Sequence, residues 1–286
     1  MLDAIARTGS LAGAARELNR VPSAISYTVR ALEEAVGVAL FDRSGHRIGL
    51  TAAGERVLEE GRDVLHRARR LEQVASTLGE GWESDLRVVV DGALPMRPIT
   101  AVMRALAERR VPTRLSVDVE YVDGVIHRFD ADNADLMLAL GLEDGGRLRG
   151  LPLGPLEMVL IASSGHPLAG RAALTRDDLS EHVDLVVKDS SPAYARTPRR
   201  AFLGSQHVMR LSDFHAKRLA ILDGVGFGWI PLHLVEADLR EGAVALLDLE
   251  GNRWTYQPQL IHRRDAALGR AASLFVSLLL EGHQKI

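Results

Sequence analysis

The sequence predicts an α/β protein that carries a small helical unit and one long helix ahead of its main domain. Three observations support this prediction. Residues 10–50 have the pattern of two short helices and a hairpin, residues 51–80 that of a single helix, and residues 84–286 alternate short apolar runs with helical stretches. Alternation of strand and helix favours parallel sheets, because parallel neighbours need a crossover connection.

Composition places the chain among folded proteins of two or three domains, since its 286 residues are 47% hydrophobic and 26% charged. No apolar run approaches the roughly 18 residues of a membrane span, and no signal segment opens the chain. A cytoplasmic protein without a membrane partner is therefore expected. The absence of cysteine excludes disulfides, thiol nucleophiles and thiolate metal sites. At a net charge of −3, nucleic-acid binding would depend on where the arginines lie.

Two short helices are predicted in the first forty residues. Ser10 is a good N-cap for the first one. Apolar residues at helical spacing then line one face, namely Leu11, Ala14, Ala15 and Leu18. Residues 19–21 break this pattern, and Pro22 suits the first turn of a second helix because its missing N–H would have no partner there.

The second helix carries two stripes on different faces. The apolar stripe consists of Ile25, Val29, Leu32 and Val36, and the polar one of Ser23, Ser26, Tyr27 and Arg30. Short hydroxyls, a phenol and an arginine on one face suit close approach to base edges and phosphates in a major groove. The alternative is an ordinary solvated face of a core helix, which an isolated amphipathic helix would favour.

A basic hairpin follows the second helix. Residues 40–43 and 48–50 have the pattern of two short strands, and Arg43 and Arg47 flank the glycine turn at Gly45. A basic hairpin beside a helix-turn-helix is typical of a winged helix-turn-helix. This arrangement favours the DNA interpretation over the solvated face.

The long helix has a heptad seam. Thr51 is its expected N-cap, and apolar or small residues follow at alternating steps of four and three, namely Val57, Gly61, Val64, Ala68, Leu71, Ala75 and Leu78. Pairing with a second copy would bury this seam, which predicts a homodimer. Packing of the helix on its own C-terminal domain is the alternative.

The C-terminal two hundred residues have the pattern of strands and helices in alternation. Strands are predicted at residues 86–90, 115–121, 135–140, 158–162, 185–187 and 208–211, and helices at residues 99–108, 214–222, 232–240 and 267–280.

A long series of motifs resembles the LysR-type transcriptional regulators. In the first part of the chain the matching residues are Gly9-Ser10-Leu11, Ala14-Ala15, Pro22-Ser23-Ala24-Ile25-Ser26, Leu32-Glu33, Gly37-Val38, Leu40-Phe41-Asp42-Arg43 and Leu50-Thr51-Ala52-Ala53-Gly54. Looser matches follow at residues 134–136, 159–168 and 224–231, so the resemblance spans essentially the whole chain. Two departures are Pro22, where many relatives carry glutamine or serine, and Tyr27, where many carry arginine. The operator of a relative therefore cannot be transferred.

The resemblance implies a sequence-specific DNA-binding regulator that senses a small-molecule effector. The residues expected to contact double-stranded DNA are Pro22, Ser23, Ser26, Tyr27, Arg30, Arg43 and Arg47. The implied domains are a winged helix-turn-helix at 1–50, a dimerisation helix at 51–80, and a two-lobed effector domain at 84–286 that resembles periplasmic binding proteins. Lobe I would take residues 84–157 and 263–286, and lobe II residues 158–262. The resemblance also implies tetramers that form as pairs of dimers. In members of this family, the first helix of the helix-turn-helix begins before the position that corresponds to Met1.

An effector cleft is expected between the lobes, beyond the carboxyl ends of the strands. The residues predicted to line it are Leu94, Met96, Ser190, Asp213 and Phe214. The alternatives are that Asp213 or Ser212 serves only as an N-cap and Ser190 only as a turn residue. Asp91 and Asp213 would disfavour an anionic effector unless Lys188 offsets them.

Two rival functions lack support in the sequence. An enzyme would be expected to show a nucleophile elbow, a zinc motif or a P-loop, and none occurs. The glycines of residues 224–228 follow a predicted helix and lead into a strand, which is the reverse of a dinucleotide fingerprint, and the histidines lack ligand spacing. We therefore expect no catalytic residue, cofactor or metal. A solute-binding protein would need a signal segment and would have no use for the first fifty residues.

Overall fold

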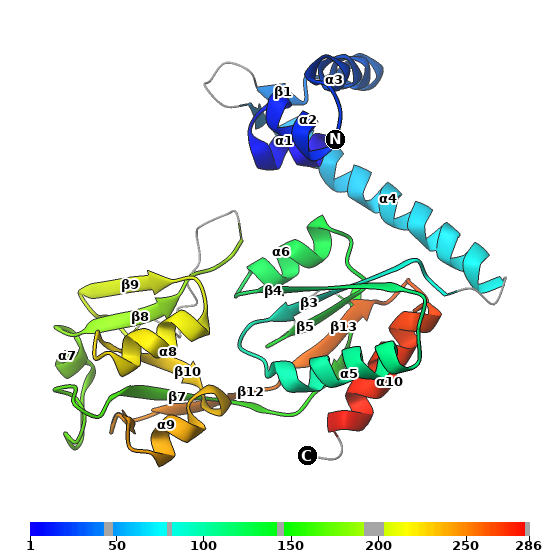
Figure 1. Ribbon diagram of the computed structural model, residues 1–286. Coiled ribbons are helices and arrows are strands. Elements are labelled where there is room, and N and C mark those ends of the chain that lie inside the picture. Colours follow the sequence, from blue (N-terminus) through cyan, green and yellow to red (C-terminus); the bar gives the residue numbers. More distant parts are fainter. Residues whose placement is uncertain (43–47, 79–81, 142–145, 192–202, 284–286) are drawn as a thin grey trace. The chain divides into compact units, whose positions relative to one another are not determined.

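The computed structural model describes residues 1–42, 48–78, 82–141, 146–191 and 203–283. The chain divides into two compact units, Met1–Glu72 and Gln73–Ile286 (Figure 1). The predicted hairpin tip with Arg43 and Arg47 lies outside the described residues, as does the end of the predicted long helix at residues 79–80. No described helix has the length and hydropathy that a membrane crossing needs.

The first unit packs short helices around one small core. Its elements are α1 (Leu2–Thr8), α2 (Leu11–Glu17), α3 (Pro22–Val36), the start of α4 (Ala52–Leu78), and the antiparallel pair β1 (Phe41–Asp42) and β2 (Gly49–Leu50). Ser10 caps α2 by accepting a hydrogen bond from the backbone N–H of Gly13 at 3.0 Å, as predicted. The apolar faces of α1 and α3 meet in the core at Ile5, Ile25 and Val29.

The start of α4 is fixed to the hairpin side of this unit. Thr51 Oγ1 accepts from the N–H of Gly54 at 3.0 Å and donates to the carbonyl of Ala39 at 2.8 Å, so the predicted cap is confirmed. A Cβ on Gly54 would lie 2.0 Å from the carbonyl oxygen of Leu40, so only glycine permits this approach. Farther along, Val64 and Leu71 of the predicted seam are 65% and 71% exposed.

The second unit contains two mixed sheets. Each sheet is the centre of one lobe, and we call these lobes I and II. The sheet of lobe I has the order β4 (Arg114–Glu120), β3 (Asp85–Asp91), β5 (Leu136–Ala139), β13 (Gln259–Arg263) and β6 (Leu148–Pro152). Helices α5 (Met96–Glu108) and α10 (Arg270–His283) lie side by side against it, and α6 (Gly124–Ala131) covers the other face (Figure 1).

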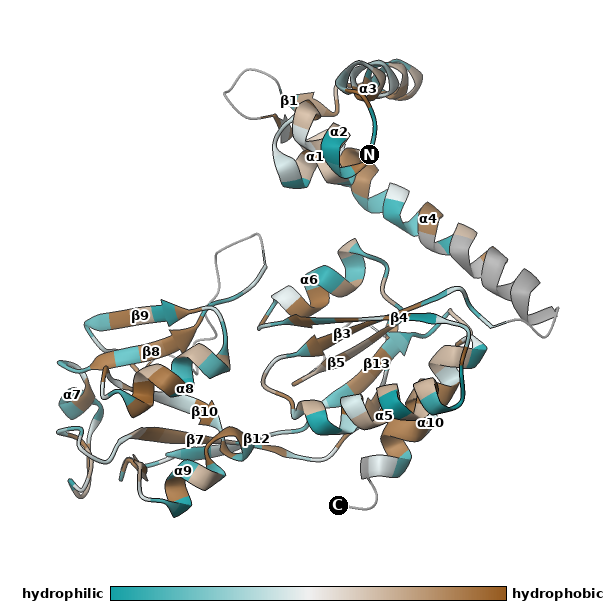
Figure 2. Cartoon of the chain, viewed as in Figure 1, coloured by the Kyte–Doolittle hydropathy of each residue, from teal (hydrophilic) through white to brown (hydrophobic). Residues whose placement is uncertain are grey.

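Lobe II also has a mixed sheet covered by helices, but its antiparallel strands are arranged differently. Its sheet has the order β11 (Val244–Leu246), β7 (Leu156–Ser163), β10 (Phe227–Pro231), β8 (Val183–Val187) and β9 (His207–Leu211), and β12 (Arg253–Tyr256) also pairs with β7. Its helices are α7 (Arg176–Leu179), α8 (Phe214–Leu222), the 3₁₀ turn η1 (Leu232–Leu234) and α9 (Glu236–Arg240). Figure 2 shows β3 and β7, the inner strands of the two lobes, coloured mainly hydrophobic, in keeping with their burial.

The expectation of parallel sheets is only half right. In each lobe three neighbouring strands are parallel, β4-β3-β5 and β9-β8-β10, and the remaining strands are antiparallel to their neighbours. The helix predicted at residues 232–240 is divided into η1 and α9. The predicted lobe boundary after His262 falls inside β13, which belongs to lobe I. The chain returns to lobe I at residues 257–258, where the carbonyl of Pro258 accepts from the N–H of Leu153 in the first crossover at 2.8 Å.

Candidate functional site

The polar stripe of α3 lies on an exposed helical face. Ser23, Tyr27 and Arg30 are exposed and Ser26 is half-buried, whereas Ile25 and Val29 on the opposite face are buried. Tyr27 is 76% exposed, which is unusual for so large a side chain. Within the described part of the chain, none of the four polar side chains has a hydrogen-bond or ion-pair partner of its own. This face is therefore free to make new contacts.

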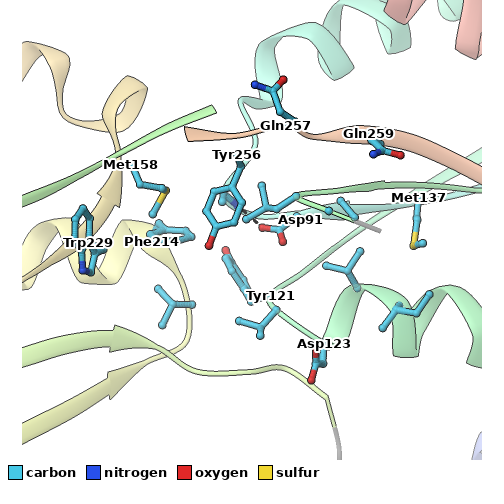
Figure 3. Close-up of a pocket in the computed structure, with 18 of the residues that line it drawn as sticks. Asp91, Tyr121, Asp123, Met137, Met158, Phe214, Trp229, Tyr256, Gln257 and Gln259 are labelled. Atoms are coloured by element: carbon cyan, nitrogen blue, oxygen red, sulfur yellow. Dashed lines mark hydrogen bonds between the residues drawn. The ribbon is translucent and has the colours of Figure 1, made fainter. Parts of the chain in front are cut away.

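A cavity of about 970 Å³ lies between the two lobes of the second unit (Figure 3). Lobe I contributes the ends of β3 and β5 and the start of α6, and lobe II contributes β8, α8, β10 and β12. The aromatic residues that line it are Tyr121, Phe214, Trp229, Trp254 and Tyr256. This volume lies within the range of small-molecule sites, which are usually concave and mostly apolar.

The aromatic side chains form two groups in the cleft. The rings of Trp229 and Trp254 lie 3.9 Å apart between centroids and are tilted by 37°, and Tyr256 meets Trp254 edge-on at 6.0 Å. Across the lobes, Tyr121 and Phe214 lie 5.9 Å apart. The indole N–H groups of Trp229 and Trp254 are buried without an acceptor among the described residues. The cleft thus offers flat apolar walls, one of which spans both lobes.

Two buried charged groups line the cleft from opposite lobes. Asp91 of lobe I is 5% exposed, and burial raises the pKa of its carboxyl to about 7, although its Oδ1 accepts from the N–H of Ala93 at 2.8 Å. Lys217 of lobe II is 3% exposed, and burial lowers the pKa of its ammonium to about 8. The nearby carboxyl of Asp184 partly offsets that shift, and its own pKa is raised to about 6 by burial.

Beside the cavity the lobes are joined by direct hydrogen bonds. Ser190 Oγ accepts from the N–H of Tyr121 at 2.8 Å, and the N–H of Ser190 donates to the carbonyl of Tyr121 at 3.3 Å. Asp189 Oδ1 accepts from the N–H of Gly124 at 3.1 Å. A Cβ on Gly124 would lie 1.9 Å from Ser190 Oγ, so this contact requires glycine.

The cleft brings together only one of the five residues predicted to bind an effector. Phe214 lines the cavity, whereas Leu94 is buried in the core of lobe I and Met96 is exposed at the start of α5. Asp213 caps α8 by accepting from the N–H of Ala216 at 2.7 Å, and Ser190 joins the lobes. Asp213 therefore makes the hydrogen bond expected of an N-cap, which was the alternative to effector binding.

Sequence reasoning missed most of the cavity wall. The aromatic residues of β12 belong to a strand that was not predicted, although Arg253, Trp254, Thr255 and Tyr256 alternate in the manner of a half-buried strand. Lys217 gave no signal, because a lone lysine in a helical pattern usually lies on the solvated face.

Comparison with known proteins identifies both units. Residues 1–55 match the family model "Bacterial regulatory helix-turn-helix protein, lysR family", and residues 79–284 match the "LysR substrate binding domain". The uncharacterized HTH-type transcriptional regulator YeeY of Escherichia coli K12 is 35% identical over 251 residues, which cover 85% of this chain and 80% of that protein. The HTH-type transcriptional regulator PunR of the same strain is 32% identical over 255 residues, which cover 87% and 81%.

Solved structures show the same fold over the full chain. ArgP from Mycobacterium tuberculosis has a TM-score of 0.65 at 19% identity and covers 100% of this chain and 96% of that one. Full-length LysG from Corynebacterium glutamicum, solved with bound effector Arg, has a TM-score of 0.59 at 18% identity and covers 99% and 96%. With two family models matching almost all of the sequence, and with the predicted resemblance thereby confirmed, this chain belongs to the LysR family of transcriptional regulators.

Proposed function

We propose that this regulator reads DNA with the exposed face of α3 and adjusts that binding to a small molecule held between lobes I and II. The proposal rests on one polar stripe of α3, which lies opposite the buried side of the helix and has no partner among the described residues. The stripe consists of Ser23, Ser26, Tyr27 and Arg30. Two hydroxyls allow the helix to lie deep in a major groove. Tyr27 can then reach base edges, and Arg30 can hold a phosphate.

Dimerisation through α4 would place two such helices on one duplex. Val64, Leu65 and Leu71 are all more than half exposed, and three large apolar side chains on one helix favour burial against a partner. A homodimer binds a site with two-fold related halves, because a two-fold axis relates its two recognition helices. We also propose that these dimers assemble in pairs as tetramers.

The cleft supplies the effector site in this proposal. It has aromatic walls, two buried charges and a wall contributed by each lobe, so a ligand there contacts both lobes at once. A ligand that binds one lobe arrangement more tightly shifts the population toward it, and the DNA-bound assembly changes accordingly. The cytoplasm is the proposed location, and no catalytic step is assigned to the cleft.

The proposal is tested by selecting duplexes from a random pool with the purified full chain. We expect a preferred site with two-fold related halves. Arg30→Ala should weaken binding to every selected duplex and reduce the slope of log K against log salt by about 0.9, because one phosphate contact is lost. Tyr27→Ala should instead change which base is preferred at one position in each half-site.

Arg210→Ala is the matched control, since it removes another exposed arginine, from β9 in the second unit. It should leave both affinity and preferred sequence unchanged. A strictly monomeric chain that selects no duplex at low ionic strength would overturn the proposal. Unchanged selection by both α3 variants would overturn the placement of the recognition helix.

A further inference from the structure

Lys217 is placed in the cleft by the start of α8. Asp213 caps this helix, and Lys217 follows one turn later, on the same side as the cavity-lining Phe214. The lysine side chain lies across strand β10 at Gly228. A Cβ on Gly228 would lie 2.8 Å from Lys217 Cε and 2.9 Å from Lys217 Nζ, so the glycine leaves the space that the ammonium occupies.

The ammonium of Lys217 lacks a close counter-ion. Within the described residues it makes no ion pair at 4.0 Å or less, and no hydrogen bond from its Nζ is found. Asp184 is coupled to it only at longer range, and Asp184 Oδ2 accepts from the backbone N–H of Leu203 at 3.4 Å. A buried ammonium is costly to keep without a partner, so an anion entering the cavity would relieve that cost.

Among the cavity-lining residues that the structure describes, Lys217 is the available cation. Asp123 also lines the cavity, but it is exposed to solvent. Arg147 also lines the cavity, but it is directed to Asp130 at 3.5 Å. Lys188, expected from the sequence to offset nearby carboxylates, is exposed and does not line the cavity. Asp91 opposes an anion only when ionised, and burial raises its pKa to about 7, so in its protonated form it donates a hydrogen bond instead.

We propose that the effector is a small organic acid with a flat apolar body, whose carboxylate pairs with Lys217 and whose body lies against the aromatic wall of Trp254 and Tyr256. This inference rests on the proposed role of the cleft as the effector site. Burial of the apolar body provides the affinity. The ion pair, formed where water is excluded, selects the charge of the ligand.

The test uses ligands that share one body and differ in charge. Phenylacetate, phenylacetamide and phenethylamine carry charges of minus one, zero and plus one, and 2-naphthoate with 2-naphthamide repeats the comparison on a larger body. Titration calorimetry on the full chain should show each acid binding at least tenfold more tightly than its amide. Phenethylamine should bind no better than the amide.

Substitution at Lys217 should remove this discrimination. In Lys217→Met the acid and the amide should bind alike, whereas Lys188→Met, which removes an exposed cation outside the cavity, should keep the tenfold preference. Should Lys217→Met fold poorly because Asp184 is left alone, the double variant Lys217→Met/Asp184→Asn removes both buried charges and provides the same readout.

Three results would each overturn the proposal: an amide or amine bound as tightly as the acid, full preference for acids in both Lys217 variants, or no binding of either acid at millimolar concentration. Failure of the regulatory function is detected separately, because duplex selection by the same preparation needs no ligand.

Discussion

The exposed face of α3 and the cleft of the second unit hold their polar groups in opposite ways. On α3, Tyr27 and Arg30 extend into solvent, while stability comes from Ile25 and Val29 on the other face of the helix. In the cleft, Asp91 and Lys217 are almost fully buried, and both line the cavity between the lobes. In the proposed sites, function and stability therefore depend on different side chains of α3 but on the same side chains in the cleft.

This difference determines what substitutions can reveal. A residue on the α3 face can be changed with little effect on folding, because exposed side chains contribute little to the free energy of unfolding. A change in the cleft would alter stability together with the proposed ligand binding, because burying a charge or a polar group costs free energy. Stability measurements therefore probe the cleft directly, and they probe the exposed face of α3 only through its packing.

The largest expected loss of stability is in the packing of the first unit, beneath the proposed DNA-reading face. Gly54→Ala would place a Cβ 2.0 Å from the carbonyl oxygen of Leu40. We expect the first unit to lose about 3 kcal/mol of stability, since backbone atoms must move, and DNA binding to be lost at 37 °C. Calorimetry should show a lower transition temperature for this unit and an unchanged one for the second unit.

Gly61→Ala is the matched control on the same helix, because a Cβ there meets nothing within 4 Å. It should stabilise α4 by up to about 1 kcal/mol through helix propensity. Equal stabilities of the two variants would show that the backbone at Leu40 moves freely to make room for the added methyl group.

The next effect is a pH dependence that arises from the cleft alone. The pKa of Asp91 is raised from 3.8 to about 7 in the folded chain, so between those values the folded state binds more protons than the unfolded state. The contribution of Asp91 to the free energy of unfolding is therefore fully present below about pH 4 and is lost as the pH rises toward 7. Asp91→Asn removes the charge and retains an acceptor for the N–H of Ala93.

Urea unfolding of the second unit at several pH values checks this prediction. The advantage of Asp91→Asn should grow by up to about 1.4 kcal/mol per pH unit between pH 4 and 7, and should stay constant above pH 7. Parallel curves for the variant and the original chain would mean that the buried carboxyl carries no such cost.

The smallest effect is expected where the lobes meet. Gly124→Ala would place a Cβ 1.9 Å from Ser190 Oγ and force the hydrogen bonds between Tyr121 and Ser190 apart. We expect a loss of about 1 kcal/mol in the second unit, the usual net value of such bonds, together with weaker binding of any ligand that contacts both lobes.

Two further variants isolate this contact. Ser190→Gly added to Gly124→Ala restores the space and should recover part of the stability. Gly141→Ala, also at the cavity but with nothing within 4 Å of its Cβ, should have no effect. Full stability in Gly124→Ala alone would show that the lobes do not depend on this contact.

The sequence was most informative where structure is local. In the first unit, the caps at Ser10 and Thr51 and the start of α3 at Pro22 depend on residues a few positions away, and all three are found as predicted. The cavity wall depends on contacts between distant segments. Phe214 and Trp254 line one cavity only because α8 and β12 belong to the same lobe, and no local pattern contains that information.

The mixed sheets illustrate the same limit. Alternation of strand and helix correctly indicated the parallel cores at β3 and β8, but it could not indicate that β13 inserts between β5 and β6. Burial of Lys217 was equally hidden, because it depends on the missing side chain of Gly228 on another element. The predicted DNA contacts on α3 remain predictions, as do the effector contacts of Phe214.

The position of β13 in lobe I also has a consequence for synthesis on the ribosome. When Tyr256 has emerged, every strand of lobe II is present, but lobe I still lacks the strand between β5 and β6. Until β13 arrives, both of those strands carry unpaired backbone groups, which other chains could bind. A transcript truncated before Gln259 would therefore yield a complete second lobe attached to an open, aggregation-prone first one.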